Sequence, residues 1–195
     1  MSAAIVVAAG RGSRLGGRPK ALLTLSPGQS FLAAIAESAR AAGVCEIVVV
    51  AGGPHRAVTE AEAARLELAV AVNAAPDRGM ASSVALGFSF AASAFAAEIA
   101  YLWPVDHPRI EVGTLGALSA AASPSLAVMP AYRGRGGHPV AVGRALWDAL
   151  SRCADAPEGA RSVFRARRER VVRIDVDDAG VVGDVDTPAD LAGIA

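Results

Sequence analysis

Hydrophobic residues along this chain fall into short unbroken runs, and the segments between the runs carry apolar residues at helical spacing. Unbroken runs such as residues 3–9 and 46–51 are typical of strands buried on both faces of a parallel sheet. Helical spacing predicts a helix from Ser30 to near Gly43. Further strands are expected at residues 68–72, 99–103, 126–130, 139–142 and 171–176, and further helices at 56–65, 81–97, 112–122, through 147–150, within 162–170 and after Pro188. This alternation predicts one α/β domain whose parallel strands are joined by right-handed crossovers.

Composition and charge exclude several classes of function. The 195 residues are 53% hydrophobic and carry no formal net charge, so no global electrostatic attraction to nucleic acid or to an anionic membrane is expected. No run approaches the roughly 18 apolar residues of a membrane span, and no basic leader precedes the first run, which predicts a soluble, cytoplasmic protein. Cys45 and Cys153 lie far apart without metal-ligand spacing, so neither a zinc site nor a disulfide framework is predicted.

The first apolar run ends in a loop rich in glycine and arginine, residues 10–20. Its four glycines allow positive φ and close approach to a ligand, and Arg11, Arg14, Arg18 and Lys20 add four positive charges. Lys20 is the only lysine among the 19 basic residues, which favours a requirement for a compact ammonium group at this position over the alternative that arginine bias left one lysine by chance. A buried strand followed by such a loop predicts a phosphate site.

Two common phosphate-binding motifs do not fit this loop. A Walker P-loop requires Lys-Ser/Thr after its last glycine, where Arg18 and Pro19 stand. A dinucleotide fingerprint requires a third glycine where Leu15 stands, and Pro19 interrupts the helix that should follow. The motif that remains is Ala-Ala-Gly-x-Gly-x-Arg-Leu-Gly followed by Pro-Lys.

This motif and three others, taken in order, resemble those of the nucleotidyltransferases related to the molybdenum cofactor cytidylyl- and guanylyltransferases. The four motifs are residues 8–16 with Lys20, residues 79–83 (Gly-Met-Ala-Ser-Ser), residues 104–108 (Pro-Val-Asp-His-Pro), and residues 137–140 (Gly-His-Pro-Val) with residues 184–188 (Asp-Val-Asp-Thr-Pro). The resemblance covers nearly the whole chain. It implies a single nucleotidyltransferase domain, residues 1–195, folded as a Rossmann-like three-layer α/β/α sandwich with a mostly parallel central sheet, of the nucleotide-diphospho-sugar transferase type. Residues 1–110 would form the nucleotide-binding half, and residues 111–195 the acceptor-binding half.

In this family a phosphate oxygen attacks the α-phosphorus of a nucleoside triphosphate, and pyrophosphate leaves. Such a reaction requires charge neutralisation and in-line positioning more than a general base, because the nucleophile is already anionic. The resemblance implies catalytic roles for Arg14 and Lys20, which would hold triphosphate oxygens, and for Asp106. The residues implied to bind the nucleotide are Ala8, Ala9, Gly10, Arg11, Gly12, Ser13, Arg14, Lys20, Gly79, Ser82 and Ser83. Serines at the start of a predicted helix are also common helix caps.

Two aspartates are implied as ligands of a Mg²⁺ cofactor. Asp106 follows a predicted central strand, where open α/β sheets bind ligands, although a turn is the alternative role for an aspartate there. Asp186 resembles the second ligand, with Asp184 as the other candidate, and the Asp-Thr-Pro sequence also suits a helix N-terminus. His138 and His107 would lie on the acceptor side of the site.

The resemblance favours transfer of CMP from CTP to molybdopterin or its molybdenum form, because Ala9 stands where guanylyltransferases tend to have a second glycine. His107 replaces the glutamine usual in the Asp-Gln-Pro motif of cytidylyltransferases, which leaves the acceptor and the base preference open. Another small phosphate ester, such as a sugar or alcohol phosphate, is the alternative acceptor. A non-catalytic cofactor-binding or insertion factor is the alternative of another class, and a molybdoenzyme is a candidate protein partner. The basic stretch 161–170 is predicted to be a solvated helix face, or else a grip on an acceptor phosphate or a partner.

Overall fold

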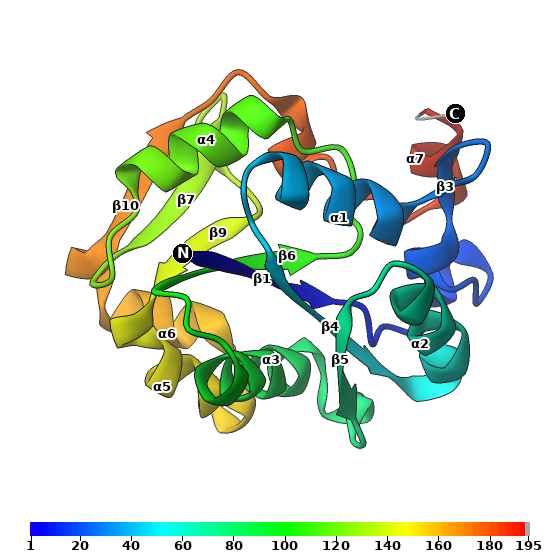
Figure 1. Ribbon diagram of the computed structural model, residues 1–195, viewed down its shortest axis with the longest axis horizontal. Helices are drawn as coiled ribbons and strands as arrows, with labels where there is room; N and C mark the ends of the chain where they lie inside the picture. The colour runs from blue at the N-terminus through cyan, green and yellow to red at the C-terminus, as the bar shows by residue number, and fades with distance from the viewer. Residues whose placement is uncertain (194–195) are drawn as a thin grey trace.

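The computed structural model describes residues 1–193, and its centre is one sheet of eight strands between two layers of helices (Figure 1). The strands lie in the order β10-β7-β9-β6-β1-β4-β5, and β8 pairs with β7. Their bounds are β1 Ser2–Val7, β4 Glu46–Gly52, β5 Ala69–Asn73, β6 Ile99–Pro104, β7 Ala127–Tyr132, β8 Arg135–Gly136, β9 Val140–Gly143 and β10 Val171–Asp175. The predicted three-layer α/β/α sandwich with a mostly parallel sheet is confirmed.

The helices cover both faces of the sheet, which is why its central strands are apolar along their whole length. On one face lie α1 Phe31–Ala41, α2 Arg56–Arg65 and α4 Val112–Ala121; on the other lie α3 Met80–Ala94, α5 Trp147–Ser151 and α6 Ala160–Ala166 (Figure 1). The first face buries Trp103, and the second buries Phe88 against Trp147. Helix α3 packs so closely on β1 that a Cβ at Gly87 would lie 2.3 Å from the Ile5 side chain.

Strand β9 corrects the expectation of parallel pairing, because it runs antiparallel to both of its neighbours, β6 and β7. Only seven residues, 133–139, connect β7 to β9, and a parallel return requires a crossover of about a dozen residues or more. The chain therefore turns back directly, through the short strand β8. The bounds of the other strands lie within about two residues of the predicted ones.

One smaller feature of the fold differs from the prediction, and two others follow it. The loop after residue 20 contains a hairpin, β2 Thr24–Ser26 and β3 Gln29–Ser30, that the sequence pattern did not predict, because its strands are too short to show a period. The basic stretch 161–170 is helical only as far as Ala166, and Arg168–Arg170 form a 3₁₀ turn. A short last helix, α7 Pro188–Ala192, follows as predicted.

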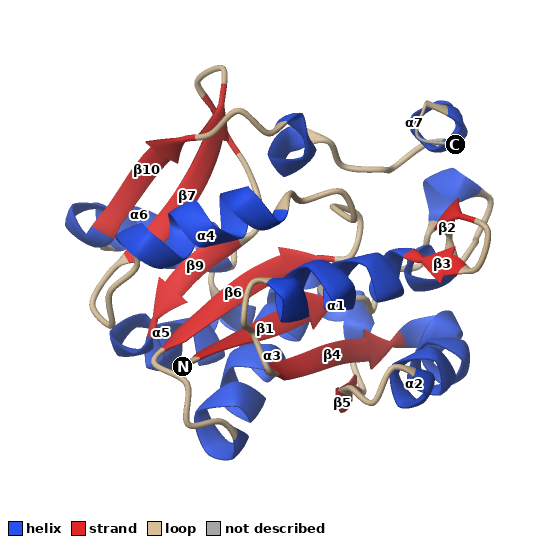
Figure 2. Ribbon diagram, turned by 45° about the horizontal axis from the view of Figure 1, so that its top comes forward, coloured by secondary structure: helices blue, strands red, loops and turns tan. Residues whose placement is uncertain are grey.

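The order of the strands places a topological switch point between β1 and β6. From β1 the chain moves to β4 and β5 on one side, and then crosses back so that β6 lies on the other side of β1 (Figure 2). Open α/β sheets bind ligands at the carboxyl ends of the strands at such a switch point. The loop after Val7 and the turn after Pro104 both lie at this end of the sheet.

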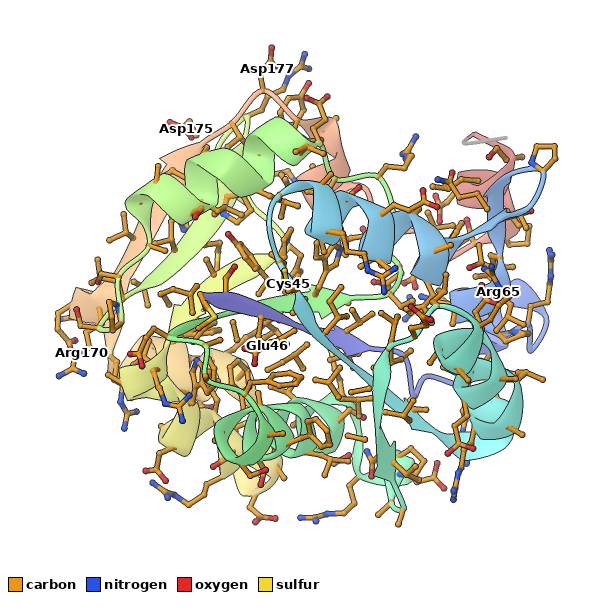
Figure 3. All side chains as sticks on the ribbon, in the orientation of Figure 1. Cys45, Glu46, Arg65, Arg170, Asp175 and Asp177 are labelled. Atoms are coloured by element: carbon orange, nitrogen blue, oxygen red, sulfur yellow. The ribbon has the colours of Figure 1, made fainter. Side chains whose placement is uncertain are left out.

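Charged side chains lie at the periphery of the molecule, for example Arg65, Arg170, Asp175 and Asp177 (Figure 3). Glu46 is partly buried: its Oε2 has no hydrogen-bond partner among the described residues, while its Oε1 accepts a bond from the Ala96 amide at 3.2 Å. Among residues 1–193, no helix has both the length and the apolar character required to cross a membrane.

Candidate active site

A cavity of about 590 Å³ opens at the carboxyl ends of β1 and β6. This volume lies within the range of roughly 300–1,000 Å³ that is usual for small-molecule sites. Most of the residues singled out in the sequence meet here, although their positions in the chain span almost its whole length. Those that line the cavity are Ala8, Ala9, Gly10, Gly12, Ser13, Arg14, Lys20, Gly79, Ser83, Asp106, His107, His138, Asp184 and Asp186.

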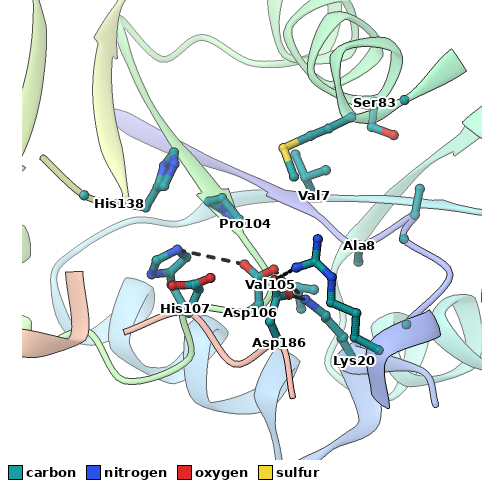
Figure 4. A pocket seen from close by; sticks show the side chains of 18 of the residues that line it. Val7, Ala8, Lys20, Ser83, Pro104, Val105, Asp106, His107, His138 and Asp186 are labelled. Carbon is teal, nitrogen blue, oxygen red and sulfur yellow. Dashed lines mark hydrogen bonds and ion pairs between the residues drawn. The ribbon is translucent and has the colours of Figure 1, made fainter. Parts of the chain in front are cut away.

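The only lysine of the chain joins the two predicted metal ligands. Lys20 Nζ donates a hydrogen bond to Asp106 Oδ2 at 2.7 Å and a second one to Asp186 Oδ1 (Figure 4). Burial acts to lower the pKa of Lys20, but the two carboxylates outweigh it and hold the pKa above its ordinary value. The hydrogen bond from Lys20 likewise lowers the pKa of Asp186, and Arg14 pairs with the same carboxylate. Lys20 and Asp186 are therefore both charged at neutral pH.

Asp186 reaches Lys20 because its segment is attached to the turn after β6. The Val185 amide donates to the Asp106 carbonyl at 2.9 Å, and the buried Val185 side chain packs in a small apolar cluster. Thr187 then caps α7, with Asp190 completing a capping box. The segment therefore does two things at once. Thr187 caps the helix, and the Asp186 side chain remains free to bond Lys20 in the cavity.

The glycine-rich loop is shaped around Gly12, which has φ 60°. A Cβ at Gly12 would lie 2.1 Å from the Arg18 carbonyl oxygen, so only glycine fits at this position. The buried Leu15 anchors the loop. Arg11 was predicted to bind nucleotide, but its side chain pairs with the exposed Asp77 at 2.6 Å and does not line the cavity.

The two serines at the start of α3 have different surroundings. Ser83 lines the cavity, whereas Ser82 does not; the Ser82 hydroxyl donates to the Gly79 carbonyl at 2.8 Å. Asn73, the last residue of β5, donates from Nδ2 to both serine hydroxyls at 2.9 Å. Ser82 thus holds the backbone of the turn before α3, and Asn73 is a supporting residue that no sequence motif indicated.

The two histidines lie together on one side of Asp106, with Lys20 on the other (Figure 4). The His107 and His138 rings are 5.2 Å apart. His107 Nδ1 lies 3.3 Å from the Gly180 carbonyl, so this nitrogen carries the proton of the hydrogen bond, and Nε2 lies 4.0 Å from Asp106 Oδ1. Burial lowers the pKa of His138 to about 4, with help from His107, so His138 is neutral at physiological pH.

Asp178 is a further supporting residue that the sequence analysis missed. It is buried, and its carboxylate accepts hydrogen bonds from the Glu111 amide at 3.0 Å, the Thr114 hydroxyl at 2.8 Å and the Gly180 amide at 2.8 Å. These bonds hold the turn in which the Gly180 carbonyl accepts a hydrogen bond from the His107 ring. An aspartate followed by Ala-Gly has the composition of any exposed turn, so the sequence contains no signal for this role.

Residues 4–171 match the family described as the MobA-like NTP transferase domain. The chain belongs to this family. As a MobA-like protein it is a nucleotidyltransferase, which confirms the enzyme class expected from the motifs.

Similar proteins cover nearly the full length of this MobA-like chain. Nicotine blue oxidoreductase of Paenarthrobacter nicotinovorans is 32% identical over 190 residues, which are 94% of this chain and 91% of that relative. Among solved structures, Rv0371c from Mycobacterium tuberculosis H37Rv has a TM-score of 0.83 at 27% identity and covers 99% of this chain and 96% of its own. The structure of Rv0371c in complex with manganese has a TM-score of 0.76 at 25% identity, and the match covers 99% of this chain and 97% of that one.

The two carboxylates of the MobA-like site fit a divalent cation by their chemistry. Asp106 and Asp186 already converge on one cationic atom, Lys20 Nζ, and both offer hard oxygen donors. Among residues 1–193, no group of three or more His, Cys, Asp or Glu side chains is arranged to hold a metal ion. A cation here would thus have two protein ligands and take its other ligands from substrate and water, which is the arrangement that Mg²⁺ favours.

Proposed function

We propose that this MobA-like protein transfers a nucleoside monophosphate, CMP by preference, from a nucleoside triphosphate to the phosphate of a small acceptor of the molybdopterin type, with release of pyrophosphate. The observation that carries the proposal is the position of Lys20, between Asp106 and Asp186 and beside the glycine-rich loop. A site with this set of charges binds triphosphate oxygens through the ammonium group and the loop amides, and holds a cation through the carboxylates. The reaction would take place in the cytoplasm.

Each residue of the triphosphate end has a separate task in this proposal. The amides of Gly10, Gly12 and Ser13 donate to phosphate oxygens, and Arg14 and Lys20 compensate the charge that develops as pyrophosphate leaves. Arg14 exchanges its pairing with Asp186 for a triphosphate oxygen, which the exposure of the Arg14 side chain permits. When bound, Mg²⁺ neutralises charge on the triphosphate. No general base is required, because the attacking phosphate is already anionic.

The remaining residues would divide between the two substrates. Gly79 and Ser83 border the space for the base and ribose, and His107 and His138 border the space for the acceptor. In this proposal residues 1–110 form the nucleotide-binding half and residues 111–195 the acceptor-binding half, and a molybdoenzyme would receive the product. A sugar or alcohol phosphate is the alternative acceptor, and a non-catalytic cofactor-binding factor is the alternative class.

A second candidate function comes from the relative of Paenarthrobacter nicotinovorans, which is named an oxidoreductase and is 32% identical to this chain. Such an activity would place a redox dinucleotide in the same cavity. Leu15 argues against it, because the glycine of a dinucleotide fingerprint is absent there. Oxidation of NADH or NADPH, followed by absorbance in the presence and absence of a dye acceptor, tests this candidate directly.

The decisive experiment follows pyrophosphate release from each of CTP, GTP, ATP and UTP with Mg²⁺ and with molybdopterin or simple phosphate esters as acceptors. We expect CTP with molybdopterin to be the best pair. The variant K20Q should lower kcat by about 10²–10³ with a much smaller effect on KM, because the ammonium acts on charge that develops in the transition state. D106N should abolish metal-dependent turnover.

R56Q is the matched control, since Arg56 is exposed, lies outside the cavity and, among the described residues, forms an ion pair only with Glu60 on its own helix. It should retain full activity. Unchanged turnover in D106N would remove Asp106 from the proposed metal site. Tight CTP binding without turnover on any acceptor would favour the non-catalytic alternative.

A further inference from the structure

Two arginines line the cavity without a carboxylate partner. They are Arg135 in β8 and Arg161 in α6. Within residues 1–193 neither guanidinium forms an ion pair, whereas Arg14, in the same cavity, is paired with Asp186. A guanidinium has five donors in a planar fork that matches phosphate and carboxylate groups. Within residues 1–193 Asp184, which also lines the cavity, forms no ion pair either, so the four Lys and Arg side chains of the lining outnumber its three carboxylates.

The backbone fixes the positions of these two arginines. Arg135 pairs with Tyr132 in the β7–β8 ladder, and a Cβ on the next residue, Gly136, would lie 2.7 Å from Met129 Sδ. Arg161 follows Gly159, which has φ 56° and where a Cβ would lie 2.7 Å from the Ala81 side chain at the start of α3. Both arginine side chains are thus attached to closely packed backbone rather than to a freely moving loop.

The lining of the cavity also contains a residue with an unpartnered polar atom. The Nδ1 atom of His138, three residues after Arg135, is buried and has no hydrogen-bond partner among the described residues. The positive charge of Arg161 is close enough to help lower the pKa of His138, after the larger effects of burial and of His107. Arg161 and His138 both line the cavity, and His138 lies on the side of Asp106 away from Lys20 (Figure 4).

The cations that line the cavity differ in their pairing. Lys20 and Arg14 are paired with Asp106 and Asp186. Arg135 and Arg161 have no such partner among the described residues, and His138 is neutral. A single phosphate bound beside Lys20 therefore does not require these two guanidinium groups, which are available to a further anion.

We propose that Arg135 and Arg161 form an anion subsite that binds a second anionic group of the acceptor, distinct from the phosphate that attacks the nucleotide. This inference rests on the proposed function, which identifies the first anionic group as the attacking phosphate. Binding of a second anion by the two arginines does not itself depend on the nucleotide. The acceptor class that it selects is a small molecule with two separated anionic groups. A singly charged alcohol phosphate would leave the two arginines without a ligand.

Calorimetric titration with synthetic probes tests the subsite. The probes are straight-chain diol bisphosphates of increasing length, each compared with the monophosphate of the same diol. The protein is first saturated with Mg²⁺ and an α,β-methylene analogue of CTP, which cannot release pyrophosphate. We expect at least one bisphosphate to bind about tenfold or more tightly than its monophosphate, the equivalent of one strong charge-assisted contact.

The variants R135Q and R161Q should each reduce this advantage to about twofold or less, while leaving binding of the monophosphates and of the CTP analogue unchanged. R168Q is the matched control, because Arg168 is exposed, lies in the same basic stretch and does not line the cavity. It removes the same charge and should retain the full advantage. All three arginines are exposed, so the variants should unfold at the wild-type urea concentration.

Two results would overturn the subsite: no bisphosphate of any length exceeding its monophosphate, or R168Q losing as much as R161Q, which would indicate general attraction to a basic surface. Failure of the proposed function can be told apart from failure of the subsite when the protein is first saturated with the CTP analogue. If the proposed function is wrong, the wild-type protein should not bind this analogue. In that case the same bisphosphate comparison on nucleotide-free protein still decides whether the two arginines bind a second anion.

Discussion

Replacement of His138 by glutamine should change how the stability of this protein depends on pH. Burial, aided by the neighbouring His107, lowers the pKa of His138 from its ordinary value of 6.5 to about 4. Between these two pH values the unfolded chain binds a proton that the folded chain does not bind. The free energy of unfolding therefore falls as the pH decreases from 6.5 towards 4, and recovers as the pH rises.

The shift in pKa sets the size of the effect. A fall from 6.5 to about 4 in the pKa of one group corresponds to about 3 kcal/mol of stability that is present at pH 7 and lost near pH 4. This is a substantial part of the roughly 5–15 kcal/mol that stabilises a typical domain. Glutamine is similar in size and does not titrate, so H138Q removes this component while all other titrating groups remain.

Urea unfolding of the wild-type protein and H138Q at a series of pH values from 7.5 to 4.5 measures the effect. The difference in the free energy of unfolding between the two proteins should change by about 2 kcal/mol or more across this range, with the wild type losing more on acidification. An NMR titration of the imidazole carbons should place the His138 transition well below that of an ordinary histidine. Parallel stability curves for the two proteins, together with a transition near pH 6.5, would refute the reasoning.

Three further substitutions test the packing that supports the site. G137A should lower the free energy of unfolding by about 1–3 kcal/mol, because its Cβ would lie 2.0 Å from the Val181 carbonyl oxygen; wild-type urea stability would show that these segments can separate. D178N should lower the free energy of unfolding by about 1–3 kcal/mol, because the new amide group must point an N–H at one of the buried donors that now bond to the carboxylate. An unchanged free energy of unfolding would contradict the hydrogen bonds described. G12A should weaken CTP binding in calorimetry about tenfold or more, since φ 60° and the Arg18 carbonyl exclude a side chain; unchanged affinity would mean that the loop does not bind the triphosphate in this form.

The secondary structure was largely predictable from the chain because its central strands are buried on both faces. Such strands are continuous apolar runs with polar residues at both ends, as in β1 and β4, so their existence is visible without any knowledge of their neighbours. Pairing direction is not visible in the same way. Strand β9 has the composition of any buried strand, and only the short connection from β7 makes it antiparallel.

The residues of the site were predictable to the extent that their chemistry is unusual in this sequence. Lys20 stands out as a lone lysine in a glycine-rich loop, and the structure does bring it to Asp106 and Asp186. Residues that act through hydrogen bonds to other parts of the site were either assigned another role, as Ser82 was, or missed, as Asn73 and Asp178 were. A common residue type in a polar stretch has no local property that distinguishes a solvated side chain from a supporting one.

By itself, then, the sequence determined the class of fold, and it singled out Lys20 as the most unusual cation of a loop for which it predicts a phosphate site. Only the tertiary structure decided which carboxylates meet that cation, since Asp106 and Asp186 are separated from it by 86 and 166 residues. The same holds for Arg135, Arg161 and His138, which only the folded chain brings into the lining of one cavity. The physical reason is that local periodicity and backbone preference are properties of neighbouring residues, whereas charge balance in a cavity depends on side chains that only the folded sheet brings together.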